Sequence, residues 1–391
     1  MATHPWDDLG PDHFLAQGSL KWTMHPGATP AFVAEMDFPV AQVVVDALQN
    51  NLTAQRFGYL PESLATELST TVQGFLDREF GWSVPESRIY PVADVLVAYD
   101  AVLQEMVKPG APIIVPTPAY MPFLSLTPLR GHPVVEVPFV ANGDRWVFDL
   151  ERIEKEFQAG AGMMILCNPH NPLGIVHTKD ELLALAEVVD RVGGLVFSDE
   201  IHSPLVFSGQ HIPYASLNEQ TKNHTVTAVS ASKAWNLAGL KCAQLIVSSD
   251  DHHKALLPKK FLISHGASTP GVEASIAAYR DGGPWLADAK TYIRRNIEHA
   301  TTRLQGAFGE HSFTPPQGTY IGWLNLSDVD PGDHNSVADF LLHDAHIALT
   351  DGARCGEVGG GHVRIILATT APILDTILTS LITATAPHIT P

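Results

Sequence analysis

Short apolar segments recur through the middle of the chain, and small or polar residues follow each of them. These segments are 112–115 (PIIV), 163–167 (MMILC), 195–198 (LVFS), 226–229 (VTAV) and 244–248 (QLIVS). Uninterrupted apolar runs of this length are typical of strands that are buried on both faces of a parallel sheet. The chain is therefore expected to fold around such a sheet.

A helix is predicted between two of these strands, over residues 179–192. Thr178 and Glu181 have the spacing of a capping box at its start. Its apolar stripe consists of Leu182, Leu185, Ala186 and Val189. Strand, helix and strand in this order predict an α/β fold with a mostly parallel sheet.

The length of 391 residues favours one large and one smaller domain. Residues 1–45 are irregular at first and rich in proline, and we expect them to form an arm that belongs to the small domain. Residues 46–270 are predicted to form the large domain. Residues 271–391 are predicted to form a smaller α+β domain, because long helices with charged faces and strand-like segments at 319–326 and 362–367 replace the earlier pattern.

The composition limits the classes of partner. A formal net charge of −18 argues against nucleic acid and anionic membranes, because both require clustered Lys and Arg. The sequence has no run of 18 apolar residues and no secretory signal at its start, so neither a membrane span nor export is expected. The cysteines, Cys167, Cys242 and Cys355, are widely spaced and form no CxxC pair. This pattern favours a reducing, cytoplasmic location and no metal site.

Residues that can carry chemistry follow four of the apolar segments. Tyr120 ends PTPAY, Asn171 lies in NPHNPLG and Asp199 begins DEIH. Lys233 follows two serines in SASK. Because parallel strands direct their carboxyl ends at one ligand crevice, these side chains are expected to meet in a single site.

Three of the charged residues have alternative interpretations. A carboxylate such as Asp199 after a buried strand needs a cation, a helix cap or a ligand. Lys233 could be an ordinary surface lysine, but it lies beyond a strand and 34 residues after Asp199, which favours a chemical role. Arg364 interrupts an apolar segment, HVRIILA, so its partner is either a substrate carboxylate or an internal acid.

Taken together, the order and spacing of Asn-Pro-x-Gly, Asp and Ser-x-Ser-Lys resemble the class I/II aminotransferase superfamily of pyridoxal phosphate enzymes. The resemblance extends from WTMHPG at Trp22 and AEMDFP at Ala34, through FGYLP at Phe57, to VRIILA at Val363. The phrases CNPHNPLG, SDEIHSPLV and SKAWNLAGLKCAQ most resemble the MalY/PatB-type carbon–sulfur β-lyases, also called cystathionine β-lyases. The resemblance implies the fold type I of pyridoxal phosphate-dependent transferases and pyridoxal 5'-phosphate as the cofactor.

The resemblance also implies roles around the cofactor ring. Lys233 would hold the cofactor as a Schiff base and later remove the Cα proton of the substrate, and Asp199 would pair with the ring nitrogen. Asn171 matches the residue that binds the phenolic oxygen of the cofactor. His202 stands near that oxygen where related enzymes often have tyrosine, and Tyr120 matches an aromatic residue that stacks on the ring. Structural roles for His202 and Tyr120 remain alternatives.

A phosphate site is implied by the same comparison. The hydroxyl groups of Ser230 and Ser232 and the charge of Lys241 fit by position, with backbone amides at Val95 and Leu96 completing the cup. Two departures from the family are evident. Lys241 replaces the more usual arginine, and the segment ADVLVAY lacks the common glycine.

The resemblance further implies an active site shared within a homodimer. Tyr59 matches a tyrosine that reaches the cofactor phosphate of the neighbouring subunit. Arg364 would bind the α-carboxylate of a small amino-acid substrate, with Tyr120 and Asn171 beside it. Tyr120 is then counted with Lys233 among the residues that contact the reacting atoms.

The predicted reaction is the cleavage of L-cystathionine or a related S-substituted L-cysteine into a thiol, pyruvate and ammonia. The residues named above serve transamination equally well, so an aminotransferase of class I/II remains an alternative. A non-catalytic regulator that binds pyridoxal phosphate is an alternative of another class.

Overall fold

A seven-stranded sheet forms the centre of the computed structural model, which describes residues 4–143 and 145–389. Its strands, in spatial order, are β2 (Ile89–Val92), β10 (Ala243–Ile246), β9 (Thr225–Val229), β8 (Val196–Asp199), β7 (Met163–Cys167), β3 (Ile113–Thr117) and β4 (Val134–Pro138). β10 runs antiparallel to both of its neighbours, and the other pairs are parallel. All of the predicted strands of the middle region lie in this sheet, so the predicted α/β class is confirmed.

Helices cover both faces of the sheet. On one face lie α5 (Val95–Met106), α6 (Met121–Leu129), α11 (Asp250–Leu256) and α12 (Lys260–Ser264), and on the other lie α7 (Leu150–Gln158), α8 (Lys179–Val192) and α9 (Glu219–His224). Within β7, Met163 and Ile165 pack toward the first group, whereas Met164 and Leu166 pack toward the second. This alternation explains why the strand is apolar throughout.

Helix α8 has the predicted bounds. It begins directly after Thr178, where the predicted capping box is formed. The hydroxyl of Thr178 accepts a hydrogen bond from the N–H of Glu181, and the carboxylate of Glu181 accepts one from the N–H of Thr178 at 2.7 Å. The reciprocal bonds satisfy backbone groups that have no partner within the helix.

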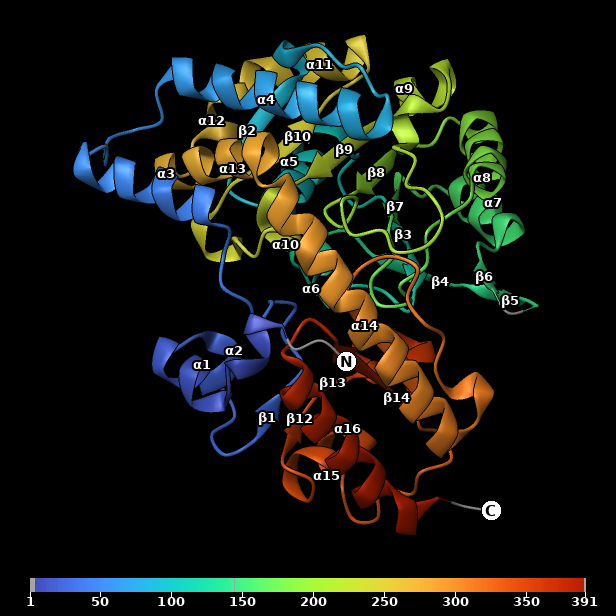
Figure 1. The fold of residues 1–391 in the computed structure, drawn as a ribbon. Coiled ribbons are helices and arrows are strands. Elements are labelled where there is room, and N and C mark those ends of the chain that lie inside the picture. The colour runs from blue at the N-terminus through green and yellow to red at the C-terminus, as the bar shows by residue number, and fades with distance from the viewer. Residues whose placement is uncertain (1–3, 144, 390–391) are drawn as a thin grey trace.

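The C-terminal part contains a smaller sheet in which β14 (His362–Ile366) lies between β11 (Ile321–Asn325) and β13 (Thr350–Asp351). Helices α15 (Val337–His343) and α16 (Ala371–Thr385) belong to the same region. Strand β1 (Thr29–Pro30) pairs in parallel with β12 (Ile347–Ala348), so the N-terminal segment with α1 (Pro11–Gln17) and α2 (Leu20–Thr23) lies beside the C-terminal part, as Figure 1 shows in blue and red. The remaining strands, β5 (Val140–Asn142) and β6 (Arg145–Val147), form a separate hairpin.

One long helix joins the two parts. Helix α14 (Gly283–Phe308) runs diagonally across Figure 1 from the large sheet to the C-terminal part. Before it, α13 (Thr269–Asp281) packs against α3 (Gln42–Thr53) and α4 (Glu62–Phe80). Helix α13 therefore contacts helices of the predicted large domain. The boundary at residue 270 and the other domain limits stay predictions. No helix in the described ranges combines the length and the apolar character needed to cross a bilayer.

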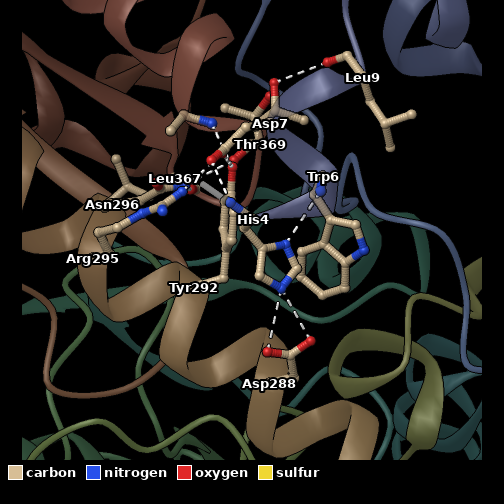
Figure 2. A network of polar contacts seen from close by, with 12 residues as sticks. His4, Trp6, Asp7, Leu9, Asp288, Tyr292, Arg295, Asn296, Leu367 and Thr369 are labelled. Carbon is tan, nitrogen blue, oxygen red and sulfur yellow. Dashed lines mark hydrogen bonds and ion pairs between the residues drawn. The ribbon is translucent and has the colours of Figure 1, made fainter. Parts of the chain in front are cut away.

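Polar contacts fasten the N-terminal segment to α14 and to the end of β14, as Figure 2 shows. Asp7 accepts a hydrogen bond of 2.5 Å from the hydroxyl of Tyr292. Asn296, also on α14, donates to the carbonyls of Leu367 and Thr369 at 2.9 and 2.7 Å. Because these carbonyls lie just beyond Arg364, the network holds the strand that carries a candidate site residue.

A buried ion pair fastens the next part of the arm. Lys21 Nζ lies 2.6 Å from Asp37 Oδ2, and both side chains are almost fully enclosed. Trp22 Nε1 donates to the other carboxylate oxygen at 2.8 Å, and the N–H of Asp37 donates to the carbonyl of Ala368. These three hydrogen bonds hold Asp37 in place, and the bond from Trp22 joins the WTMHPG segment to the AEMDFP segment.

Candidate active site

The ends of β7, β8 and β9 bring three predicted residues to one edge of the large sheet. Cys167 at the end of β7 pairs in register with Asp199 at the end of β8, and Asp199 pairs with Ala228 of β9. Asn171 follows β7 directly, and Lys233 lies on the short helix α10 (Ala231–Ala234) after β9. The edge is thus lined by an amide, a carboxylate and an amine, as the sequence predicts.

Asp199 is a buried carboxylate with little to neutralise it. One of its oxygens accepts a hydrogen bond of 3.1 Å from the N–H of Ile201, and it forms no ion pair within the described ranges. Burial raises the pKa of Asp199 to about 7, although the bond from Ile201 and the charge of Lys233 oppose the rise. A cationic group placed against this carboxylate would relieve its desolvation.

Lys233 is half-buried, and its amine is held by the arm. Its Nζ donates to the carbonyl of Ala34 at 3.0 Å. Burial lowers the pKa of Lys233 to about 8, and the guanidinium of Arg364 contributes to the decrease. At pH 7 most of the amine is still protonated, but the unprotonated form, which acts as a nucleophile or a base, is far more populated than in an ordinary lysine.

Tyr320 and Asn236 are site residues that the sequence analysis missed. The hydroxyl of Tyr320 donates to the same carbonyl of Ala34 at 2.9 Å. The side chain of Asn236 makes two hydrogen bonds of 2.9 Å with the backbone of Met36, and its own φ is 60°. Asn236 stands within SKAWN, so its nearness to Lys233 was a signal, whereas nothing in the sequence around Tyr320 points to this site.

Arg364 is buried in β14, and the described residues offer it no acidic partner. Its Nη1 donates to Asn171 Oδ1 at 3.2 Å and its Nη2 donates to the carbonyl of Phe32 at 2.8 Å. Its Nε is buried and has no hydrogen-bond acceptor, and burial lowers the pKa of the guanidinium. Among the described residues no carboxylate pairs with Arg364, so the internal ion pair that was one of its two interpretations is not found. A charge of this kind needs an anionic ligand.

The turn that carries Asn171 depends on the glycine of the Asn-Pro-x-Gly motif. Gly174 has a φ of 67°, and a Cβ there would lie 2.4 Å from Cβ of Pro316. Only glycine tolerates both the left-handed backbone and the close approach. The motif thus fixes the position of Asn171, whose carbonyl oxygen supports Arg364 while its amide nitrogen stays available.

His202 and Tyr120 lie among the same charged groups. His202 is buried, and burial together with the charges of Lys233 and Arg364 lowers its pKa to about 3. It is therefore a neutral ring, and its Nδ1 has no hydrogen-bond partner. Burial, followed by the charge of Asp199, raises the pKa of Tyr120, so its phenol stays protonated. Both residues are close enough to the charged groups to act in the site.

Of the two serine hydroxyl groups predicted for the phosphate site, that of Ser230 already makes hydrogen bonds within the protein. The hydroxyl of Ser230 caps α10 by accepting from the N–H of Ser232, and it donates to the carbonyl of Cys242 at 2.7 Å. Ser230 is thus committed to contacts within the protein. Lys241 is exposed and pairs with Asp94 at 3.0 Å.

The amides of Val95 and Leu96 lie in the first turn of α5. Asp94 is the N-cap of this helix and accepts from the N–H of Val97, which leaves the preceding two N–H groups without a helical partner. Lys241 lies beside this cap because of its pair with Asp94. The arrangement suits an anion, since helix N-termini attract negative charge.

Tyr59 lies away from these groups on an exposed apolar surface. Its side chain is 89% exposed. The apolar side chains of Phe57, Phe261 and Leu262 are exposed as well. A cavity of about 830 Å³ is lined by Tyr59, Leu60, Phe261 and His265, among other residues. The chain alone therefore leaves Tyr59 outside the site formed by Lys233 and Asp199.

Residues 33–381 match the family of class I and II aminotransferases, in agreement with the fold and the site. The chain belongs to this family. It is 32% identical over 339 residues to a cystathionine beta-lyase of Corynebacterium glutamicum, with 86% of this chain and 89% of the relative covered. It is 31% identical to cystathionine beta-lyase PatB of Bacillus subtilis, with 90% and 92% covered.

Among solved structures, the chain is similar to cystalysin from Treponema denticola, a protein described as containing a pyridoxal 5'-phosphate cofactor. The TM-score is 0.88 at 26% identity, with 95% of this chain and 96% of cystalysin covered. Similarity over nearly the whole length confirms the predicted fold type I and the predicted family.

Proposed function

We propose that this chain is a pyridoxal phosphate-dependent carbon–sulfur β-lyase that acts on L-cystathionine or a related S-substituted L-cysteine. Its products are a thiol, pyruvate and ammonia. The convergence of Lys233, Asp199 and an Arg364 without an acidic partner carries the proposal. The names of the relatives, cystathionine beta-lyases that cover most of the chain, favour a lyase over an aminotransferase.

The residues present fit the cofactor. The buried carboxylate of Asp199 would face the protonated ring nitrogen of the cofactor. The lowered pKa of Lys233 suits a bond between its amine and the aldehyde carbon of the cofactor. The amide nitrogen of Asn171 would bind its phenolic oxygen. The first turn of α5 and Lys241, with Ser232 beside them, would hold its phosphate. Ser230 would act indirectly, by capping the helix that carries Lys233.

Each side chain then has a defined part in the reaction. When bound, the cofactor supplies an electron sink for the negative charge that develops at the substrate Cα. Arg364 holds the substrate carboxylate through a charge-assisted hydrogen bond, and Asn171 fixes the guanidinium. Lys233 Nζ takes the Cα proton and can return a proton to the departing sulfur. Tyr120, whose phenol stays protonated, would cover the reacting atoms.

The second subunit is part of the proposal. Tyr59 and the exposed apolar residues near it form a surface suited to a homodimer interface, and Tyr59 would reach the cofactor phosphate of the neighbouring subunit. A cytoplasmic location is also proposed, and the three buried, unpaired cysteines support it.

The reaction is tested by measuring pyruvate and free thiol released from L-cystathionine by the purified protein with added pyridoxal phosphate. Equal amounts of both products without a keto-acid acceptor are expected, and Lys233→Ala serves as the inactive control. Glutamate formed from 2-oxoglutarate, with negligible pyruvate, would show an aminotransferase instead. Cofactor binding without turnover of any amino acid would favour a regulator.

The shared site is tested by mixing two inactive variants, Tyr59→Ala and Lys233→Ala. If Tyr59 serves the neighbouring subunit, each mixed dimer contains one intact site, so random reassociation restores about a quarter of the wild-type activity. The same mixture without subunit exchange is the control. No recovery after exchange, with dimers present by analytical ultracentrifugation, would exclude a shared site.

A further inference from the structure

A cavity lined by several cationic side chains lies where α14 begins. It measures about 920 Å³ and lies between the ends of α4 and α13, the first turns of α14 and the loop 203–211. Its lining includes four cationic side chains, Arg78, Arg280, Lys290 and Arg294, and one carboxylate, Glu79. This surplus of positive charge stands out in a chain whose net charge is −18.

Two of the four cations have partners and two do not. Arg78 pairs with Glu79 at 3.0 Å, and Arg280 pairs with acidic neighbours outside the cavity. Within residues 4–143 and 145–389, Lys290 and Arg294 form no ion pair, and Arg294 donates only to the carbonyl of Phe207 at 3.1 Å. The cavity thus contains two cationic side chains, a half-buried Lys290 and an exposed Arg294, that have no ion-pair partner among the described residues.

These two charges lie on the same face of one helix. Lys290 and Arg294 are four residues apart on α14, a spacing that places side chains next to each other. Burial lowers the pKa of Lys290, and the neighbouring charge of Arg294 lowers it further, while Glu79 opposes the change. Like charges four residues apart destabilise a helix slightly, and an anion bound between them would relieve the repulsion.

A buried polar atom in the wall of the cavity is also without a partner. His211 lines the cavity and is 97% buried, and its Nδ1 has no hydrogen-bond partner. Its other ring nitrogen lies 3.0 Å from a carboxylate oxygen of Glu200, which immediately follows Asp199. His211 and Glu200 thus connect the wall of the cavity to the backbone next to Asp199.

We propose that this cavity is a second ligand site, which binds a small organic or inorganic anion with at least two negative charges of the phosphate class. Lys290 and Arg294 hold the anion. The volume suits a small molecule rather than a polymer. The site is separate from the residues assigned to the lyase reaction, so its existence does not depend on that assignment.

The test is isothermal titration calorimetry of inorganic phosphate and of pyrophosphate into the holoenzyme, in which the predicted cofactor phosphate site is already filled. One saturable site per chain is expected, with pyrophosphate binding more tightly. Lys290→Met keeps the alkyl stem and removes the charge, so affinity should fall about ten-fold or more. Lys290→Arg keeps the charge and should retain binding.

The control is Lys179→Met, which removes an exposed lysine that forms no ion pair among the described residues. This variant should bind both anions like the wild type. The proposal is overturned if neither anion gives a saturable site, if Lys290→Met binds normally, or if both methionine variants weaken binding equally. Lyase activity measured without added anion should be unchanged in Lys290→Met, which shows that a loss of binding does not reflect misfolding.

Discussion

Replacing Asp199 by Asn should stabilise the cofactor-free protein, and more so as the pH rises. Burial raises the pKa of Asp199 from 3.8 to about 7, so between these values the folded protein retains a proton that the unfolded chain releases. The stability that this group contributes is therefore complete below pH 3.8 and is lost as the pH rises through about 7. At 1.36 kcal/mol for each pKa unit, the loss is about 4 kcal/mol, of which about 3 kcal/mol falls between pH 5 and pH 8.

Asn has nearly the same shape and does not ionise, so the variant escapes this loss. The measurement is urea unfolding of cofactor-free wild type and Asp199→Asn at pH 5, 6, 7 and 8. The difference in the free energy of unfolding should grow with pH, while the variant loses activity with the cofactor bound. Asp77→Asn removes an exposed carboxylate and controls for net charge. A difference that is the same at every pH would refute the argument that burial of the charge governs the stability.

Three further predictions concern the cofactor lysine, the substrate carboxylate and the arm. Lys233→Ala should abolish both turnover and covalent cofactor attachment, as followed by absorbance; a nearly normal rate would show that another lysine is used. Arg364→Gln should lower kcat/KM about 30-fold or more, because a buried charge pair with the substrate is worth about 2 kcal/mol or more; an unchanged KM for S-substituted cysteines would exclude a role in binding the carboxylate. Asp37→Asn should lower the free energy of unfolding by about 3–5 kcal/mol, since it leaves Lys21 buried without its partner. Adding Lys21→Met should recover most of this loss in urea unfolding, and strictly additive losses would show that the two residues do not interact.

Local rules in the sequence predict the large sheet and α8 well. Each apolar run is a strand because it is covered on both faces, and the capping box at Thr178 defines the helix start through two reciprocal hydrogen bonds. The alignment of strand ends then predicts that Asp199, Asn171 and Lys233 meet, because parallel neighbours end at one edge.

The role of the N-terminal arm could be predicted only in part. WTMHPG and AEMDFP carry the family resemblance, but the hydrogen bond between Trp22 and Asp37 that joins them is visible only in the folded structure. The carbonyls of Phe32 and Ala34, which hold Arg364 and Lys233, have no signal in the sequence because every residue has a carbonyl.

The sequence by itself determined the class of fold, the order of the strands along the chain and the identity of the residues at the edge of the sheet, because strand burial, helix capping and motif spacing are local properties. Only the tertiary structure decided which groups neutralise those residues. Among the described residues it leaves Arg364 and Asp199 without an ion-pair partner, through contacts between segments that are far apart in the chain. Burial and charge compensation depend on every element packed around a side chain, so they are properties of the folded molecule.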